Sequence, residues 1–178
     1  MDFRIWLASA LIVTFLSWFN VGKAPSPKEI LLSGDWLFKT GDNVNWKNPA
    51  ASDSDWVYLK VPATWESQGY PNYDGVAWYR KHVQIPADWQ DSAGIIFDVG
   101  KIDDEDEVYF NGQLVGAHSG WQDYRKYSVP KDLVKFDQDN IIAVRVNDTG
   151  GNGGIWEGAV KLVTGIMPRY GARDVDSY

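Results

Sequence analysis

The sequence predicts an all-β protein, an antiparallel β-sandwich of about eight or nine strands. Short runs that alternate apolar and polar residues recur at fairly regular intervals and end at Gly, Pro, Asn or Asp. No segment has a convincing helical periodicity of three turns or more. The pair Asn111-Gly112 lies between two β-rich runs and predicts a type I′ hairpin, because Asn and Gly best tolerate positive φ at both central positions. Together these patterns are typical of a sandwich.

The expected strands follow one another along the chain with turn residues between them. Residues 77–85 alternate most clearly, with Tyr79 and Val83 on the inner face and Arg80 on the polar face. A single helical turn is expected at 130–133. The full set of expected strands is 36–39, 56–61, 77–85, 94–99, 108–110, 113–115, 124–129, 140–147 and 159–163.

The two ends of the chain differ in composition from the middle. Residues 1–24 are expected to form a signal peptide or a membrane anchor, because an apolar run covers residues 5–21. That run is short for a comfortable bilayer span of about 20 residues. A linker is expected at 25–32, the β-sandwich at 33–166 and a tail without periodicity at 167–178. The folded part is therefore expected to be secreted or periplasmic, either free or held at the membrane by residues 5–21.

Composition excludes several classes of function. The formal net charge of −7 argues against binding to nucleic acid or to anionic membrane surfaces. The chain has no Cys, which removes disulfides, thiol catalysis and thiolate metal sites. It has ten Trp, nine Tyr and seven Phe, more than a core of this size can easily bury. Some of these rings are therefore expected at the surface, where they can stack on a flat ligand.

An acidic stretch precedes the predicted hairpin. Five consecutive acids, from Asp103 to Glu107, crowd like charge that water, a cation or basic groups must compensate. Asp103, Asp104 and Asp106 are the candidate ligands of a metal, and their hard oxygen atoms suit a structural calcium ion. Their spacing is not that of an EF-hand loop, and no other cofactor is expected. The alternatives are a sugar-hydroxyl site and a solvated acidic loop.

Three groups of residues have the composition of a sugar site, because sugars present a C–H face to an aromatic ring and hydroxyl edges to planar polar groups. An alternative makes Trp65, Trp78 and Trp156 core aromatics that close the ends of the sandwich, with the glycines of 149–154 permitting a tight turn. We favour that alternative for Trp78. The three groups are Trp65, Glu66, Tyr70, Tyr73 and Asp74; Asp148, Asn152, Trp156 and Glu157; and Trp121, Asp123 and Arg125.

Three motifs in order resemble a known family. They are W-V-Y-L-K-V-P-A-T-W-E-S-Q-G-Y-P-N-Y-D-G-V-A-W-Y-R (56–80), I-D-D-E-D-E-V-Y-F-N-G (102–112) and A-V-R-V-N-D-T-G-G-N-G-G-I-W-E-G (143–158). They resemble the galactose-binding-like jelly-roll domain of β-galactosidase and β-glucuronidase relatives in glycoside hydrolase family 2, and most closely the jelly roll carried by sialate O-acetylesterases. The resemblance covers about residues 33–164 and implies a jelly-roll topology. It also implies that an acid at the position of Asp148 can reach a sugar held by a neighbouring catalytic domain.

Catalysis by this chain alone is not expected. Only His82 and His118 are available for a Ser-His-carboxylate arrangement, and neither lies near a recognisable nucleophile motif. Glu66 and Glu157 each follow a Trp, but nothing in the sequence defines the separation that a glycosidase pair needs.

The sequence therefore predicts an exported, non-catalytic module that binds carbohydrate or assists a carbohydrate-active enzyme. Its expected partners are a carbohydrate ligand and a catalytic hydrolase domain or subunit. The alternative is a structural or interaction jelly roll that is a fragment of a larger sialate O-acetylesterase or family 2 glycoside hydrolase.

Overall fold

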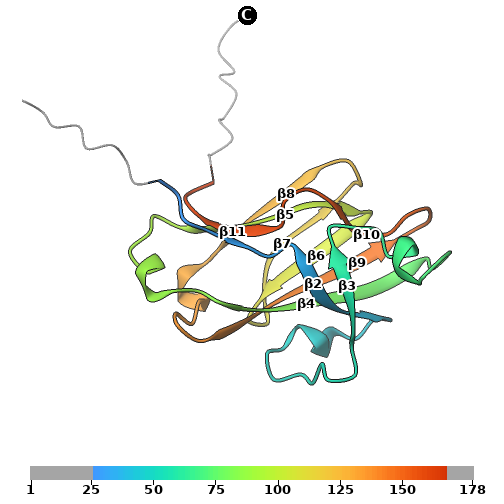
Figure 1. Ribbon diagram of the computed structural model, residues 1–178, viewed down its shortest axis with the longest axis horizontal. Coiled ribbons are helices and arrows are strands. Elements are labelled where there is room, and N and C mark those ends of the chain that lie inside the picture. The colour runs from blue at the N-terminus through green and yellow to red at the C-terminus, as the bar shows by residue number, and fades with distance from the viewer. Residues whose placement is uncertain (1–25, 168–178) are drawn as a thin grey trace, which may run out of the picture.

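The computed structural model describes residues 26–167, which form two antiparallel sheets packed face to face (Figure 1). The first sheet contains β1 (Glu29–Leu31), β5 (Ile95–Asp103), β8 (Tyr124–Val129), β10 (Gly154–Glu157) and β11 (Lys161–Thr164). The second has the order β3-β2-β4-β9-β6-β7, with β2 at Gly34–Thr40, β3 at Val57–Val61, β4 at Gly75–Gln84, β6 at Glu105–Phe110, β7 at Gln113–Ser119 and β9 at Asp139–Asp148.

The predicted all-β sandwich is thus confirmed. The helical segments of the described residues are four short 3₁₀ turns: η1 (Val44–Lys47), η2 (Glu66–Gln68), η3 (Ala87–Trp89) and η4 (Lys131–Leu133), the last at the predicted helical turn. From residue 26 to residue 167, no helix is long and apolar enough to cross a bilayer. The predicted leader at 1–24 and nearly all of the predicted tail lie outside the described residues.

The structure has eleven strands instead of about eight or nine. The prediction missed β1, which lies in the expected linker and pairs with β11 from Glu29↔Val163 to Leu31↔Lys161. It also missed β10, which follows the glycine loop and pairs with β5. Both strands are too short for alternation to show, since three or four residues contain at most two repeats of the two-residue period.

The Asn111-Gly112 hairpin is present between β6 and β7. Both residues have positive φ, +48° and +85°, as a type I′ turn requires. The amide of Asn111 donates to the Leu133 carbonyl and to Asn140 Oδ1, and Asn111 Oδ1 accepts from the Ile141 backbone N–H at 2.9 Å. Asn111 therefore ties the hairpin to β9 and to the η4 segment, which explains why this position needs an amide in addition to a left-handed backbone.

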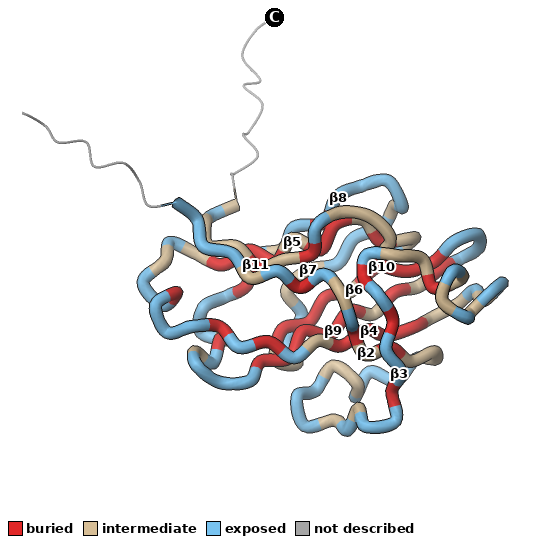
Figure 2. Tube along the Cα trace, viewed as in Figure 1, coloured by how far each residue is buried: buried red, intermediate tan, exposed pale blue. Residues whose placement is uncertain are grey.

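The main core lies between the two sheets, where buried segments of both face one another (Figure 2). Trp36 and Phe97 stack across it with ring centroids 6.4 Å apart, and both side chains are fully buried. Tyr79 and Val83 lie in this core, as the alternation of residues 77–85 predicts. A sandwich packed in this way leaves its strand ends and connecting loops to form sites.

A second, smaller core covers the outer face of the six-stranded sheet. Trp56, Trp78 and Tyr109 are buried there, with Trp46 packed against them, under the loop of residues 41–56. Arg80, expected on a solvated polar face, is only 1% exposed because this loop covers it. Its guanidinium donates to Asp53 and to the backbone carbonyls of the same loop. The prediction of a buried Trp78 is confirmed, and that of an exposed Arg80 is wrong.

Candidate functional site

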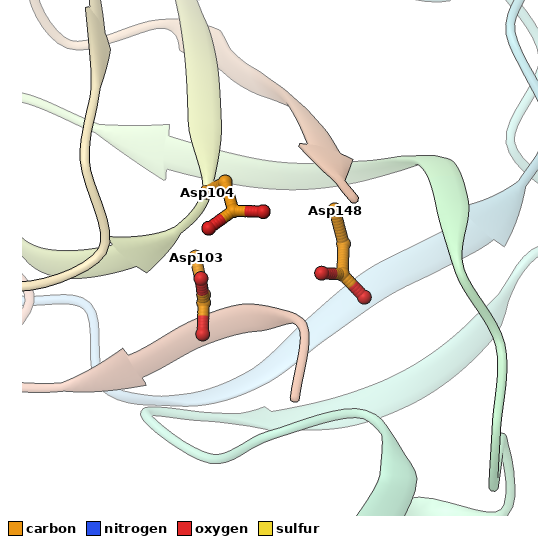
Figure 3. Close-up of side chains that lie close together, drawn as sticks. All are labelled: Asp103, Asp104 and Asp148. Atoms are coloured by element: carbon orange, nitrogen blue, oxygen red, sulfur yellow. The ribbon is translucent and has the colours of Figure 1, made fainter. Parts of the chain in front are cut away.

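Three aspartates converge at one end of the sandwich (Figure 3). Asp103 is the last residue of β5, Asp104 lies in the tight connection to β6, and Asp148 is the last residue of β9. One carboxylate oxygen from each lies within 4.8 Å of the corresponding oxygens of the other two. We call these three residues the aspartate cluster. Asp103 and Asp104 are neighbours in the chain, and Asp148 meets them because β6 pairs with β9, with Glu105 opposite Asn147.

The loop that follows β9 is held onto the cluster by hydrogen bonds. Asp104 Oδ2 accepts from the backbone N–H of Thr149 at 3.0 Å and from its hydroxyl. Asp148 Oδ1 accepts from the backbone N–H of Gly150 at 3.0 Å. Asp148 Oδ2 is buried and has no hydrogen-bond partner. The cluster therefore fixes the start of the glycine loop and still leaves one buried acceptor free.

The three carboxylates differ in protonation because of their surroundings. Burial, followed by the hydrogen bond and charge of Asp104, raises the pKa of Asp103 to about 7. Burial also raises the pKa of Asp148 above its usual value, against the opposing effect of the Gly150 N–H. The hydrogen bonds from Thr149 and Asp103 hold the pKa of Asp104 below its usual value. The cluster therefore has one firmly ionised carboxylate beside two that resist ionisation.

A further acid lies under the end of the glycine loop. Glu66 Oε1 accepts from the backbone N–H of Gly153 at 3.0 Å, whereas Glu66 Oε2 is buried without a partner. The hydroxyl of Tyr79, which is fully buried, has no hydrogen-bond partner either. This end of the sandwich thus concentrates polar atoms that are shielded from water and not satisfied by the described protein atoms.

An aromatic surface borders the same end of the molecule. Trp121, on the loop between β7 and β8, is 49% exposed, and its ring centroid lies 6.3 Å from that of Trp156 on β10. Tyr124, at the start of β8, is 59% exposed. The ammonium of Lys101 lies 4.9 Å from the Tyr124 ring centroid and 5.1 Å from that of Trp156. We call Trp121, Tyr124 and Trp156 the aromatic face.

Glu157 lies next to the aromatic face and bonds to two of its neighbouring polar groups. Its Oε1 accepts from the hydroxyl of Tyr124 at 2.8 Å and lies 2.9 Å from Lys101 Nζ. The aromatic face connects to the aspartate cluster through the loop backbone, since the N–H of Gly120 donates to the Asp104 carbonyl at 2.8 Å. Stacking surfaces, a cation and a carboxylate therefore lie side by side.

Several residues predicted for sugar binding lie elsewhere. Trp65 is fully buried in the main core, so its ring has no face to offer a ligand. Tyr70 and Tyr73 are half-buried and pack against that core, and Tyr73 donates its hydroxyl hydrogen to the Val76 carbonyl. Of the first predicted group only Asp74 is exposed, and Glu66 is half-buried. The core interpretation therefore describes Trp65, and the first predicted group is not one exposed set.

The other two predicted groups are partly brought together. Trp121, Trp156 and Glu157 gather on the aromatic face, and Asn152 is exposed on the glycine loop. Arg125 is buried and donates to Asp106, so neither side chain is available to a ligand or a metal. Asp148 takes the place of Asp106 in the aspartate cluster. The candidate ligand set is corrected accordingly to Asp103, Asp104 and Asp148.

Tyr124 of the aromatic face and the adjacent Lys101 were not singled out from the sequence. Lys101 and Tyr124 stand directly opposite one another in the β5–β8 pairing, and Glu157 pairs with Lys101 on the other side of β5. Only the strand register reveals this, because the three residues are far apart along the chain. The sequence predicted the strand at 124–129 but not its neighbours.

Comparison with known proteins places this architecture in a family. Residues 40–152 match the family described as "Beta-galactosidase second all-beta domain". The chain belongs to this family. The matched residues include the whole aspartate cluster and stop before Trp156 and Glu157. The predicted relation to family 2 glycoside hydrolases is thereby confirmed at the level of a β-sandwich domain.

This chain spans only a small part of the length of the proteins that it matches. A "Beta-glucuronidase" of Formosa agariphila is 28% identical over 132 residues, which is 66% of this chain and 13% of that protein. The structure of Bacteroides uniformis beta-glucuronidase 2 superimposes with a TM-score of 0.69 and 26% identity, covering 78% of this chain and 18% of its own. A Ruminococcus gnavus b-glucuronidase, 18% identical, shares the fold with a TM-score of 0.69 over 80% of this chain and 30% of its own.

Proposed function

We propose that this domain is a non-catalytic module that binds carbohydrate through its aromatic face and serves a sugar-acting hydrolase. The observation that carries the proposal is the grouping of Trp121, Tyr124 and Trp156 around Lys101, with Glu157 alongside. Exposed rings of this size cost free energy in water unless a ligand or another protein surface covers them. Sugars match such a surface, because their C–H faces stack on rings while their hydroxyls bond to charged groups.

The charged pair of Lys101 and Glu157 would set the orientation of a ligand on the aromatic face. Lys101 and Glu157 lie within 2.9 Å of each other and flank the rings, so one donor and one acceptor are presented along one edge. The pair is partly exposed, and the hydroxyls of a sugar can replace or extend its hydrogen bonds. A ligand bound in this way would be oriented by Lys101 and Glu157 and held by the rings.

The proposal that the domain is non-catalytic is supported by where its titratable groups lie. The two ring nitrogens of His82 face Asp139 at 2.7 Å and Asp53 at 3.1 Å, and His118 Nε2 faces Asp123 at 3.0 Å. Glu157 bonds to Lys101 and Tyr124, whereas Glu66 bonds to the glycine loop. The two glutamates therefore belong to different local networks. The family match is to an all-β domain, which is consistent with an accessory role.

A second candidate function is docking to a catalytic hydrolase domain or subunit. It is favoured by the large share of each relative that lies outside the matched region. Under this alternative the aspartate cluster and the aromatic face pack against that partner, which would be a sialate O-acetylesterase or a family 2 glycoside hydrolase. Residues 5–21 motivate placing either form outside the cytoplasm, secreted or periplasmic.

A glycan array probed with the purified protein separates the two candidates. Carbohydrate binding predicts saturable signals on a defined set of glycans, which are lost when Trp121 is replaced by Ala. An array without signal at a protein concentration of about 100 μM would reject sugar binding by the isolated domain and favour the docking alternative. The purified protein should also hydrolyse nitrophenyl glycosides and nitrophenyl acetate no faster than the buffer does; saturable turnover would reject the non-catalytic assignment.

A further inference from the structure

We infer that Asp103, Asp104 and Asp148 form a calcium-binding site that locks the glycine loop onto the end of the sandwich. The geometry is the first argument. Ca²⁺ binds carboxylate oxygens at about 2.3–2.6 Å, so two ligands on opposite sides of one ion are about 4.6–5.2 Å apart. The three aspartate oxygens lie within 4.8 Å of one another, which is close enough for one ion to be shared after small adjustments of the side chains.

The unpartnered oxygen of Asp148 is the second, independent argument. Asp148 is only 2% exposed, and its Oδ2 has neither water access nor a hydrogen-bond donor. A buried acceptor left in this state costs about 1–3 kcal/mol, and more for a charged group. A cation between Asp148 and its two neighbours would satisfy this atom. Figure 3 shows the three carboxylates gathered around a common space.

The charge balance is the third argument. Among residues 26–167, no Lys, Arg or His nitrogen lies within 4.0 Å of a carboxylate oxygen of Asp103, Asp104 or Asp148. The guanidinium of Arg125, which bonds to the Asp104 backbone, is committed to Asp106 and to the backbone carbonyls of Asp104 and Asp123. No basic side chain of the described residues therefore offsets the charge of this cluster, and a divalent cation is the simplest group that would do so.

Calcium is preferred over magnesium for two reasons. Mg²⁺ requires oxygens at about 2.0–2.1 Å in near-octahedral geometry and gives up its water ligands reluctantly. Ca²⁺ accepts longer and less regular contacts and can fill remaining positions with water or carbonyls.

The consequence of binding would be a more ordered loop. Thr149 and Gly150 already donate to Asp104 and Asp148. An ion held by the same two carboxylates would fix their orientation, and with it the start of the chain that runs on to Trp156. The calcium site would thus influence the position of Trp156 in the aromatic face through the loop, without itself contacting a sugar.

The test compares the full-length protein with matched variants after removal of divalent ions by a chelator. The melting temperature and the heat of binding are measured during titration with CaCl₂ at constant ionic strength. At about a hundredfold excess of calcium over its Kd, the melting temperature of the wild type should rise by about 5–10 °C. Asp148→Asn should abolish the rise, whereas Asp132→Asn, the same change at an exposed aspartate on η4, should leave it intact.

Without calcium, the melting temperatures of the wild type and the variant should differ in the opposite direction. Without calcium, Asp148→Asn should melt at or above the wild-type temperature, because it removes like-charge repulsion. If that variant does not fold, Asp103→Asn, at the half-buried end of β5, takes its place with the same expectations. The inference is overturned if the wild type shows neither a binding heat nor a shift with calcium, if both cluster variants respond like the wild type, or if magnesium stabilises as well as calcium.

Discussion

Arg125 Nε donates to Asp106 Oδ1 across 2.9 Å, and both side chains are completely buried between the sheets. Asp106 lies on β6 of the second sheet and Arg125 on β8 of the first, so this ion pair links the two layers. The hydroxyl of Tyr127 donates to the other oxygen of Asp106. The pair is therefore fully hydrogen-bonded in a place where one partner alone would be a buried, uncompensated charge.

Removing one partner of this pair should strongly destabilise the fold. We expect Arg125→Leu to lower the free energy of unfolding by about 3–5 kcal/mol, because Asp106 stays buried without its cation. Urea denaturation measures the change. The control is Lys60→Leu, which breaks an exposed pair with Asp35 and should cost no more than about 1 kcal/mol. Equal losses in the two variants would contradict a structural role for the buried pair.

A second prediction concerns the packing of the glycine loop on Trp65. A methyl group on Gly153 would overlap the indole ring of Trp65, and the backbone of Gly153 is not left-handed, so the conflict is purely steric. Gly153→Ala should therefore cost about 1–3 kcal/mol of stability through overpacking. Combined with Trp65→Leu, the same substitution should cost clearly less than it does alone. Strict additivity in this double-mutant cycle would show that Gly153 does not pack on Trp65.

The strands of this fold were predictable where they are long and alternate. Residues 77–85 and 140–147 have that pattern, and β4 and β9 follow it closely. The hairpin at Asn111 was predictable because its turn has a specific backbone requirement. The short strands β1 and β10 were not, because their pairing depends on partners far away in the chain.

The site was less predictable than the fold. Residue type alone indicated which acids could bind a metal. Only the β5–β6 connection and the β6–β9 register show that Asp148, and not Asp106, lies beside Asp103. Arg125 illustrates the reason. Its charge favoured an exposed role, whereas the facing sheet supplies a buried Asp106 that neutralises this charge. Burial of this kind depends on tertiary pairing, which a local pattern does not contain.

A third prediction concerns the titration of His82. Burial disfavours its charged form, but the hydrogen bonds and charges of Asp139 and Asp53 outweigh burial and raise the pKa of His82 above its usual value of about 6.5. NMR titration of the ring should show this directly, and Asp139→Asn should lower the pKa. A wild-type pKa of His82 below about 6.5 would contradict the observed pairing.

The same shift has a consequence for stability. Because the folded-state pKa of His82 is the higher one, its contribution to stability is fully present below the unfolded pKa and is lost as pH rises through the folded pKa. Compared with His82→Gln, the wild type should therefore gain more stability at pH 5.5 than at pH 8.5. The gain is expected to be small, since the imidazole is about half exposed. Chemical denaturation at the two pH values measures it.

The last prediction tests the aromatic face. Trp121 is half exposed and Trp156 half buried, so replacing Trp156 changes both packing and any ligand contact, while Trp121 reports mainly on the ligand. For a glycan identified on the array, Trp121→Ala should weaken binding by about a hundredfold, equivalent to about 2.7 kcal/mol, and shift the melting temperature by no more than about 2 °C. Tyr58→Ala removes an even more exposed ring from β3 and should leave affinity unchanged. Calorimetric titration of the wild type, Trp121→Ala and Tyr58→Ala with the glycan measures the three affinities. If Trp121→Ala binds as tightly as Tyr58→Ala, the rings do not form the sugar site. If Trp121→Ala instead unfolds, its ring packs more firmly than its exposure indicates, and the aromatic face is part of the core.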